Sequence, residues 1–107
     1  MVTIEEFSKM DLRVGTVTSA KPHPNADRLL VLTVDIGEET ERQLVAGIRA
    51  HYSPEELVGR QLVVVANLQP AKLRGVESQG MLLAASDGDQ VIVLRPEKRV
   101  RVGSQVR

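Results

Sequence analysis

The sequence contains no cysteine, so disulfide bonds, thiolate metal sites and thiol-based catalysis are all excluded. Its two histidines, His23 and His51, do not have the spacing of a metal-binding motif, and each is interpreted as a turn or surface residue. No sequence pattern of a nucleophile elbow, a P-loop or a dinucleotide-binding loop occurs either. We therefore expect a protein that is not an enzyme and that binds neither a metal ion nor a cofactor.

Aromatic side chains and long apolar runs are also scarce. Phe7 and Tyr52 are the only aromatic residues, and both suit core positions. Extended single strands usually bind by stacking on aromatic rings, whereas a folded RNA is recognised mainly through its shape, phosphates and 2′-hydroxyls. No apolar run approaches the ~20 residues that cross a bilayer, and no basic segment typical of a secretory signal follows Met1. We expect a soluble, cytoplasmic protein without membrane contact.

Charge of one sign is not in excess, because fourteen basic residues balance fourteen acidic ones. The balance does not point to a polyanionic partner, yet residues 1–41 hold four bases against eight acids and residues 42–107 hold ten against six. Local positive patches are compatible with that distribution. The tail, residues 95–107, carries five bases and alternating valines. It is open to three interpretations, a polyanion-binding arm, an added strand or a dimer contact.

Sixteen valines outnumber twelve leucines and four isoleucines, which favours strands because β-branched side chains pack well on a pleated surface. The apolar pattern predicts strands at residues 12–17, 29–36, 42–48, 61–66, 81–85 and 91–94. A chain of 107 residues is expected to form one domain, residues 1–107. We predict a mostly β protein, a five-stranded OB-fold barrel with a short helix between strands three and four.

Two short helices are predicted from capping signals. Thr3 and Glu6 form a capping box for an amino-terminal helix, which is expected to dock through its apolar residues Ile4 and Phe7. Ser53-Pro54 begins the second helix, between the third and fourth strands.

The segment between the last two buried runs, residues 67–80, collects polar groups in a region punctuated by proline and glycine. It holds an amide, two cations and a hydroxyl, which are the groups that bind phosphates and riboses. The alternative is an ordinary solvated loop. Arg42, expected on the exposed side of the third strand, and Arg28, at the entry to the second, would extend a positive patch there.

Motifs of a known family occur in order along nearly the whole chain. They are Phe7, Asp11–Gly15, His23–Leu30, Val45–Ile48, Tyr52–Arg60, Val64–Leu68, Pro70, Lys72–Leu73, Gly75, Ser78 and Gly80–Ala85. Together they resemble the tRNA-binding domain appended to the carboxy terminus of bacterial methionyl-tRNA synthetases, which also occurs as small free-standing proteins. The resemblance implies a homodimeric OB-fold that grips the outer corner of tRNA by shape, independently of sequence, as an accessory to aminoacylation or tRNA handling.

The resemblance also implies the residues that contact RNA. Asn67 and Ser78 would hydrogen-bond the backbone or ribose, Lys72 would neutralise a phosphate, and Met81 would contact a base or shape the pocket. A core position is the alternative for Met81. Arg42 and Arg74 are further candidates on the same surface.

The resemblance also bears on partners, on a rival function and on whether the chain is independent. Dimerisation in such proteins uses the amino-terminal segment and the carboxy-terminal tail, and an aminoacyl-tRNA synthetase is a further candidate partner. A related branch, the secretion-associated chaperones, has the same fold but binds peptides and would expose an apolar groove. Met1 directly before a capping box favours an independent chain, and an excised synthetase domain is the other interpretation.

Overall fold

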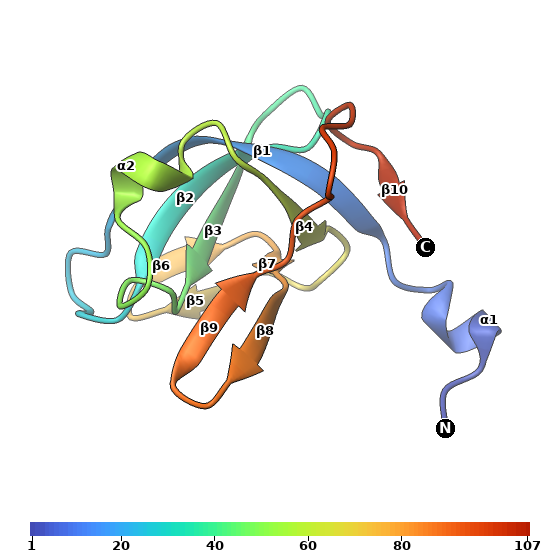
Figure 1. Cartoon of the computed structure of the whole chain (residues 1–107), viewed down its shortest axis with the longest axis horizontal. Helices are drawn as coiled ribbons and strands as arrows, with labels where there is room; N and C mark the ends of the chain where they lie inside the picture. The colour runs from blue at the N-terminus through green and yellow to red at the C-terminus, as the bar shows by residue number, and fades with distance from the viewer.

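The computed structural model describes residues 1–107, and its main feature is a strongly curved antiparallel sheet with strand order β3-β2-β1-β4-β7 (Figure 1). The strands are β1 Leu12–Pro22, β2 Leu30–Asp35, β3 Arg42–Ala46, β4 Gln61–Val65, β5 Ala71–Leu73, β6 Val76–Ser78, β7 Met81–Leu82, β8 Ala84–Asp87, β9 Gln90–Val93 and β10 Gln105–Val106. The helices are α1 Ile4–Phe7 and α2 Pro54–Leu57, with α2 between β3 and β4. The predicted OB-fold barrel, including the place of its helix, is confirmed.

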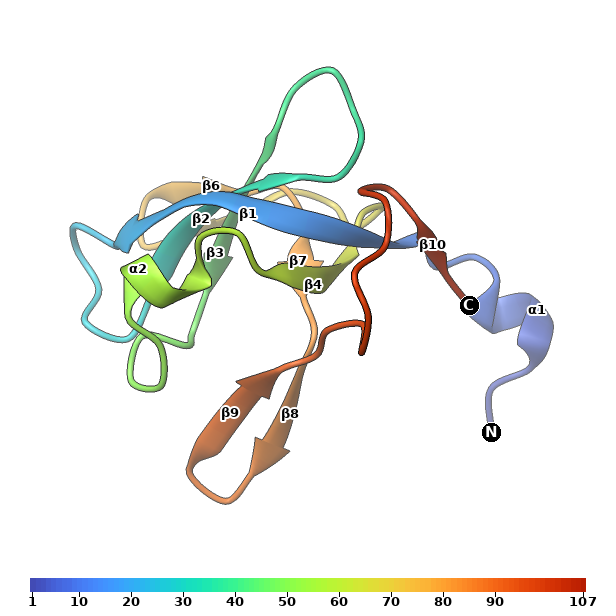
Figure 2. The same ribbon diagram turned by 45° about the horizontal axis from the view of Figure 1, so that its top comes forward.

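The core lies inside the curved sheet and is almost entirely aliphatic. Leu30, Leu32 and Leu44 are completely buried, and they alternate along β2 and β3 because successive side chains of a strand point to opposite faces. Tyr52 packs against this core, and its hydroxyl accepts a hydrogen bond from the backbone N–H of Val93 at 3.1 Å. That bond ties the projecting β8–β9 hairpin to the barrel (Figure 2).

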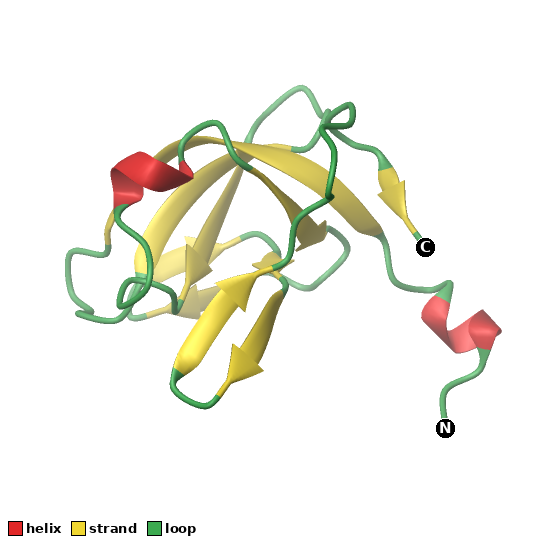
Figure 3. Cartoon of the chain, in the orientation of Figure 1, coloured by secondary structure: helices red, strands yellow, loops and turns green.

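The amino-terminal helix does not dock as expected. The capping box of Thr3 and Glu6 is present, but α1 has no buried residue and stands away from the barrel (Figure 3). Ile4 is 79% exposed and Phe7 is also exposed, so the expected core position of Phe7 is wrong. Capping signals fix where the helix begins, but they do not dock it. A single helical turn offers little apolar surface for packing against the barrel. Neither helix has the length and apolar character needed to cross a membrane.

The tail adds a strand, one of its three interpretations. β10 pairs antiparallel with the start of β1, and the side-chain amide of Gln61 binds the carbonyl oxygen of Val100 at 2.6 Å. Both ends of the chain consequently lie at the same end of the molecule, away from the turn between β5 and β6 (Figures 1 and 2).

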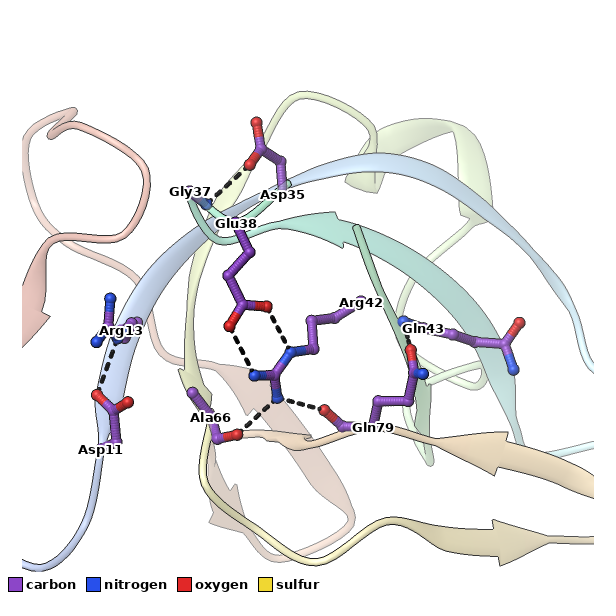
Figure 4. Close-up of polar contacts among 9 residues, drawn as sticks. All are labelled: Asp11, Arg13, Asp35, Gly37, Glu38, Arg42, Gln43, Ala66 and Gln79. Atoms are coloured by element: carbon purple, nitrogen blue, oxygen red, sulfur yellow. Dashed lines mark hydrogen bonds and ion pairs between the residues drawn. The ribbon is translucent and has the colours of Figure 1, made fainter. Parts of the chain in front are cut away.

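Between β3 and the segment before β7, the barrel is completed mainly by side chains, together with one backbone bond from the N–H of Gln79 to the carbonyl oxygen of Gln43 at 2.7 Å. The guanidinium of Arg42 donates to the carbonyl oxygens of Ala66 at 2.6 Å and Gln79 at 2.9 Å. The side-chain oxygen of Gln79 accepts from the backbone N–H of Gln43 at 2.9 Å, and Ser78 Oγ accepts from Val45 at 3.0 Å. We call these contacts of Arg42, Gln43, Ser78 and Gln79 the closure seam, and Figure 4 shows those of Arg42, Gln43 and Gln79.

Arg42 is further held by Glu38, which binds its guanidinium through two hydrogen bonds of 2.8 and 2.9 Å. The side chain of Arg42 is only 22% exposed, so its expected place on the exposed side of the third strand is wrong. The hydrogen bond from Arg42 lowers the pKa of Glu38 below its ordinary value.

This ion pair predicts a pH-dependent stability. Because the pKa of Glu38 is lowered in the folded state, the unfolded chain takes up the proton first as the pH falls, and the stabilisation present above about pH 4.3 is lost below it. Glu38→Gln is expected to lower the free energy of unfolding at pH 7 by less than ~1 kcal/mol, since the pair is partly exposed. The difference from the native chain should become smaller at pH 3 than at pH 7. Urea denaturation at both pH values measures it, with the exposed Glu39→Gln as the control. A difference of equal size at both pH values would contradict the ion-pair explanation.

Candidate nucleic-acid interface

The polar segment 67–80 is not the plain loop that the sequence suggested, since it contains the β5–β6 hairpin. Leu73 pairs with Val76, leaving Arg74 and Gly75 as a two-residue turn. Both have positive φ angles, 53° and 88°, as in the type I′ turns that favour asparagine followed by glycine. An arginine in this conformation costs roughly 1–2 kcal/mol. Such a local cost is typical of positions kept for a function.

Two free cations stand on this hairpin. Lys72 and Arg74 are exposed, as is all of β5. The three ion pairs of the molecule use Arg13, Arg42 and Arg60, so neither hairpin cation forms one, although Lys72 lies opposite Glu77 in the strand pairing. Their charges are available to an external anion.

Met81 lies at the rim of an apolar cavity of about 400 Å³ beside the hairpin. Ten of the fourteen lining residues are hydrophobic, Leu68, Leu73 and Met81 among them. Met81 is 45% exposed, which excludes the alternative core position. Sequence reasoning missed this cavity, although two leucines within a polar segment, Leu68 and Leu73, were a signal of it.

Ser78 also lines the cavity, but its hydroxyl has partners inside the protein. It accepts from the N–H of Val45 and donates to the carbonyl oxygen of Gly80 at 2.8 Å, and the residue is 5% exposed. Gly80 is required here, because an added Cβ would lie 2.9 Å from the carbonyl oxygen of Val65. Ser78 therefore joins the hairpin to β3 at the cavity wall.

Asn67 and Arg42 lie apart from the hairpin cations. The Asn67 side chain accepts from the N–H of Asp11 at 2.8 Å and donates to the carbonyl oxygen of Lys9 at 2.7 Å, yet the residue remains exposed. Arg42 is engaged in the closure seam. The structure thus places Ser78 and Met81 at the cavity and Lys72 and Arg74 on the adjoining hairpin. Asn67 and Arg42 have internal partners.

His23, interpreted from the sequence as a turn or surface residue, makes a contact that the sequence did not predict. It lies in a turn, as expected, but it is 3% exposed rather than on the surface. Its Nδ1 is 2.9 Å from the backbone nitrogen of Asn25, and its Nε2 is 2.9 Å from the carbonyl oxygen of Leu73. A histidine beside prolines in a turn gave no signal for this contact with the distant hairpin.

Comparisons with known proteins agree on one family. The family model of the tRNA binding domain matches residues 12–105. The chain is 58% identical over 106 residues to a methionine–tRNA ligase of Thermococcus kodakarensis, covering 99% of this chain and 14% of that protein. A second such ligase, from Thermotoga maritima, is 54% identical over 105 residues, which are 98% of this chain and 16% of the ligase.

Two solved structures match the whole chain. The MetRS-related protein of Pyrococcus horikoshii is 40% identical with a TM-score of 0.92, covering 100% of this chain and 98% of that one. The chaperone CsaA of Bacillus anthracis is 33% identical with a TM-score of 0.90, covering 100% and 99%. The same fold and length therefore occur in proteins with two different descriptions.

The internal bonds of Ser78 predict a stability effect. Ser78→Ala leaves the buried N–H of Val45 and the carbonyl oxygen of Gly80 without this partner, and it is expected to lower the free energy of unfolding by ~1–3 kcal/mol. Ser86→Ala, at an exposed position of β8, is the matched control and should change it by less than ~0.5 kcal/mol. Urea denaturation measures both. Equal effects of the two variants would remove Ser78 from the closure seam.

Proposed function

The chain belongs to the tRNA-binding domain family, and from this premise we propose that it binds folded tRNA as a non-catalytic module. The chain spans only 14% of the methionine–tRNA ligase that it matches, so the activity of those ligases is not transferred to it. The observation that carries the proposal is the β5–β6 hairpin, which carries Lys72 and Arg74 without an ion pair and lines the apolar cavity through Ala71 and Leu73. Phosphate contacts of this kind position an RNA without reading its sequence.

The proposed RNA surface consists of Asn67, Lys72, Arg74, Ser78, Met81 and Arg42, in two different roles. Lys72 and Arg74 neutralise phosphates, Met81 contacts a base or ribose from the cavity rim, and the exposed amide of Asn67 adds a hydrogen bond. Ser78 and Arg42 act through the closure seam by holding the hairpin in place. With few cations and few aromatic rings, the surface suits a folded RNA recognised by shape, with moderate affinity and a modest dependence on salt.

We further propose that the module acts as a homodimer in the cytoplasm, as an accessory to aminoacylation or tRNA handling beside an aminoacyl-tRNA synthetase. A groove of about 390 Å³ between α1 and β10 supports the dimer. It is lined by Ile4, Phe7, Met10 and Val106, whose apolar side chains a second copy would cover. This groove lies at the opposite end of the molecule from the β5–β6 turn, so dimerisation leaves the hairpin open (Figure 1). Asn67, which is bonded to Lys9 and Asp11, is the member of the RNA surface nearest to the groove.

Peptide binding is the second candidate function. The apolar cavity favours it, because a peptide chaperone binds exposed apolar segments. Two solved structures described as CsaA chaperones share the fold. The free cations on the hairpin favour RNA, since an apolar peptide does not require them.

The test of the RNA surface is Lys72→Ala, measured by fluorescence anisotropy of labelled mixed tRNA. Loss of one phosphate contact is expected to weaken binding several-fold and to lower the slope of log Kd against log salt by about 1. Sedimentation should show an unchanged oligomeric state, because β5, which contains Lys72, lies away from α1 and β10.

Lys98→Ala is the matched control, since it removes an exposed lysine from the tail without touching the hairpin. Equal loss of affinity in both variants would show that only overall charge matters. Displacement of tRNA by an unstructured apolar peptide, or absence of tRNA binding, would favour the chaperone function instead.

A further inference from the structure

A hollow of about 310 Å³ lies between the loop that joins β1 to β2 and the tip of the β5–β6 hairpin. We call it the tip cleft. Its lining residues are Asn25, Ala26, Asp27, Arg28, Leu29 and Arg74. The two segments are distant in sequence but lie side by side in both views of the ribbon (Figures 1 and 2). Unlike the apolar cavity, it is mostly polar, with only two hydrophobic residues in its lining.

The tip cleft has an excess of positive charge. Arg28 and Arg74 line the cleft from two different segments, against the single carboxylate of Asp27. All three residues are exposed, and none of them forms an ion pair within the protein. A guanidinium presents several N–H donors in a planar fork, a geometry that matches phosphate oxygens. Two such groups on opposite walls suit a single phosphate between them.

His23 holds the two walls together. Because Nδ1 accepts a hydrogen bond from the N–H of Asn25, the ring proton must lie on Nε2, which donates to the carbonyl oxygen of Leu73. Asn25 belongs to one wall of the tip cleft, and Leu73 directly precedes Arg74 on the other. The buried imidazole thus sets the separation of Arg28 and Arg74 before any ligand binds.

The loop wall is fixed from a second side as well. The guanidinium of Arg49 donates to the carbonyl oxygen of Ala26 at 3.3 Å. The backbone N–H of Arg49 donates to the carbonyl oxygen of Arg28, also at 3.3 Å. Held between Arg49 and His23, the loop has little freedom to move on binding. Groups ordered in advance lose less entropy when the ligand arrives.

We propose that the tip cleft is a phosphate-binding site for the RNA backbone, with Arg28 and Arg74 as its donors and His23 as a positioning residue. The proposal rests on the tRNA binding proposed above. It extends that surface from the hairpin to the β1–β2 loop, and it explains why an arginine occupies a left-handed position at the hairpin tip.

Three charge variants test the donors through the Kd for mixed tRNA. Arg74→Asn removes the charge but keeps the turn, because asparagine before glycine suits a type I′ turn. Arg28→Gln removes the second charge at an exposed position. Each is expected to weaken binding several-fold and to lower the salt slope by about 1. Asp27→Asn is expected to change affinity in the opposite direction, strengthening binding by removing the repulsive carboxylate.

A matched pair of variants tests His23. In His23→Asn the side-chain oxygen takes the place of Nδ1 and keeps the bond to Asn25, but the side chain is too short to reach Leu73. In His23→Gln the amide nitrogen reaches the position of Nε2 and keeps the bond to Leu73. We expect weakened tRNA binding for His23→Asn and recovery for His23→Gln. In an Arg74→Asn background His23→Asn should cost little further affinity, because it acts through that donor.

A direct probe separates this site from the proposed function. Inorganic phosphate titrated into the native protein is expected to shift the amide resonances of Asn25, Arg28 and Gly75, and to do so less in Arg74→Asn. If tRNA binds the native protein but the arginine variants bind it equally well, the tip cleft is overturned and the proposed function stands. If tRNA does not bind while phosphate shifts these resonances, the proposed function fails and the anion site remains. Absence of both effects overturns both.

Discussion

The bonds of Arg42 hold the barrel closed, and the RNA surface proposed above depends on them. Its guanidinium reaches the carbonyl oxygens of Ala66 and Gln79, at the two ends of the segment that contains the hairpin. A regular ladder would hold these strands by backbone bonds alone. Here the seam uses side chains, so the hairpin is free to fold outward and pair with itself. The cavity lies beside the hairpin, and the tip cleft lies at its far end.

Much of the fold could be predicted from local patterns. The alternation along β2, the capping box of α2 and the turn before β9 each act within a few residues, and each is present in the structure. The position of α1 could not be predicted, because a capping box indicates where a helix begins but carries no information about the surface against which the helix packs. The hairpin within residues 67–80 was missed since its strands are only three residues long, too short for an alternation of apolar and polar residues to mark them.

The candidate site was predicted in its residue types more than in its contacts. Lys72, Arg74 and Met81 are each exposed, because an unpaired charge or thioether in a polar segment has few other places to lie. Ser78 and Arg42 instead have internal partners at long sequence separation. The contact between His23 and Leu73 spans 50 residues. Such contacts depend on how the barrel closes, which no local pattern in one sequence records.

Both ends of the chain lie on the side of the barrel away from the hairpin tip. A polypeptide joined to either end would leave from that side, so the module tolerates fusion without obstruction of its binding surface. Covalent attachment would also raise the effective concentration of a bound RNA near the attached protein, often to the millimolar range for a short linker. A weak module then suffices as a tether, because affinity no longer has to come from contact area alone. The neutral overall charge and the small number of free cations are consistent with that mode of action.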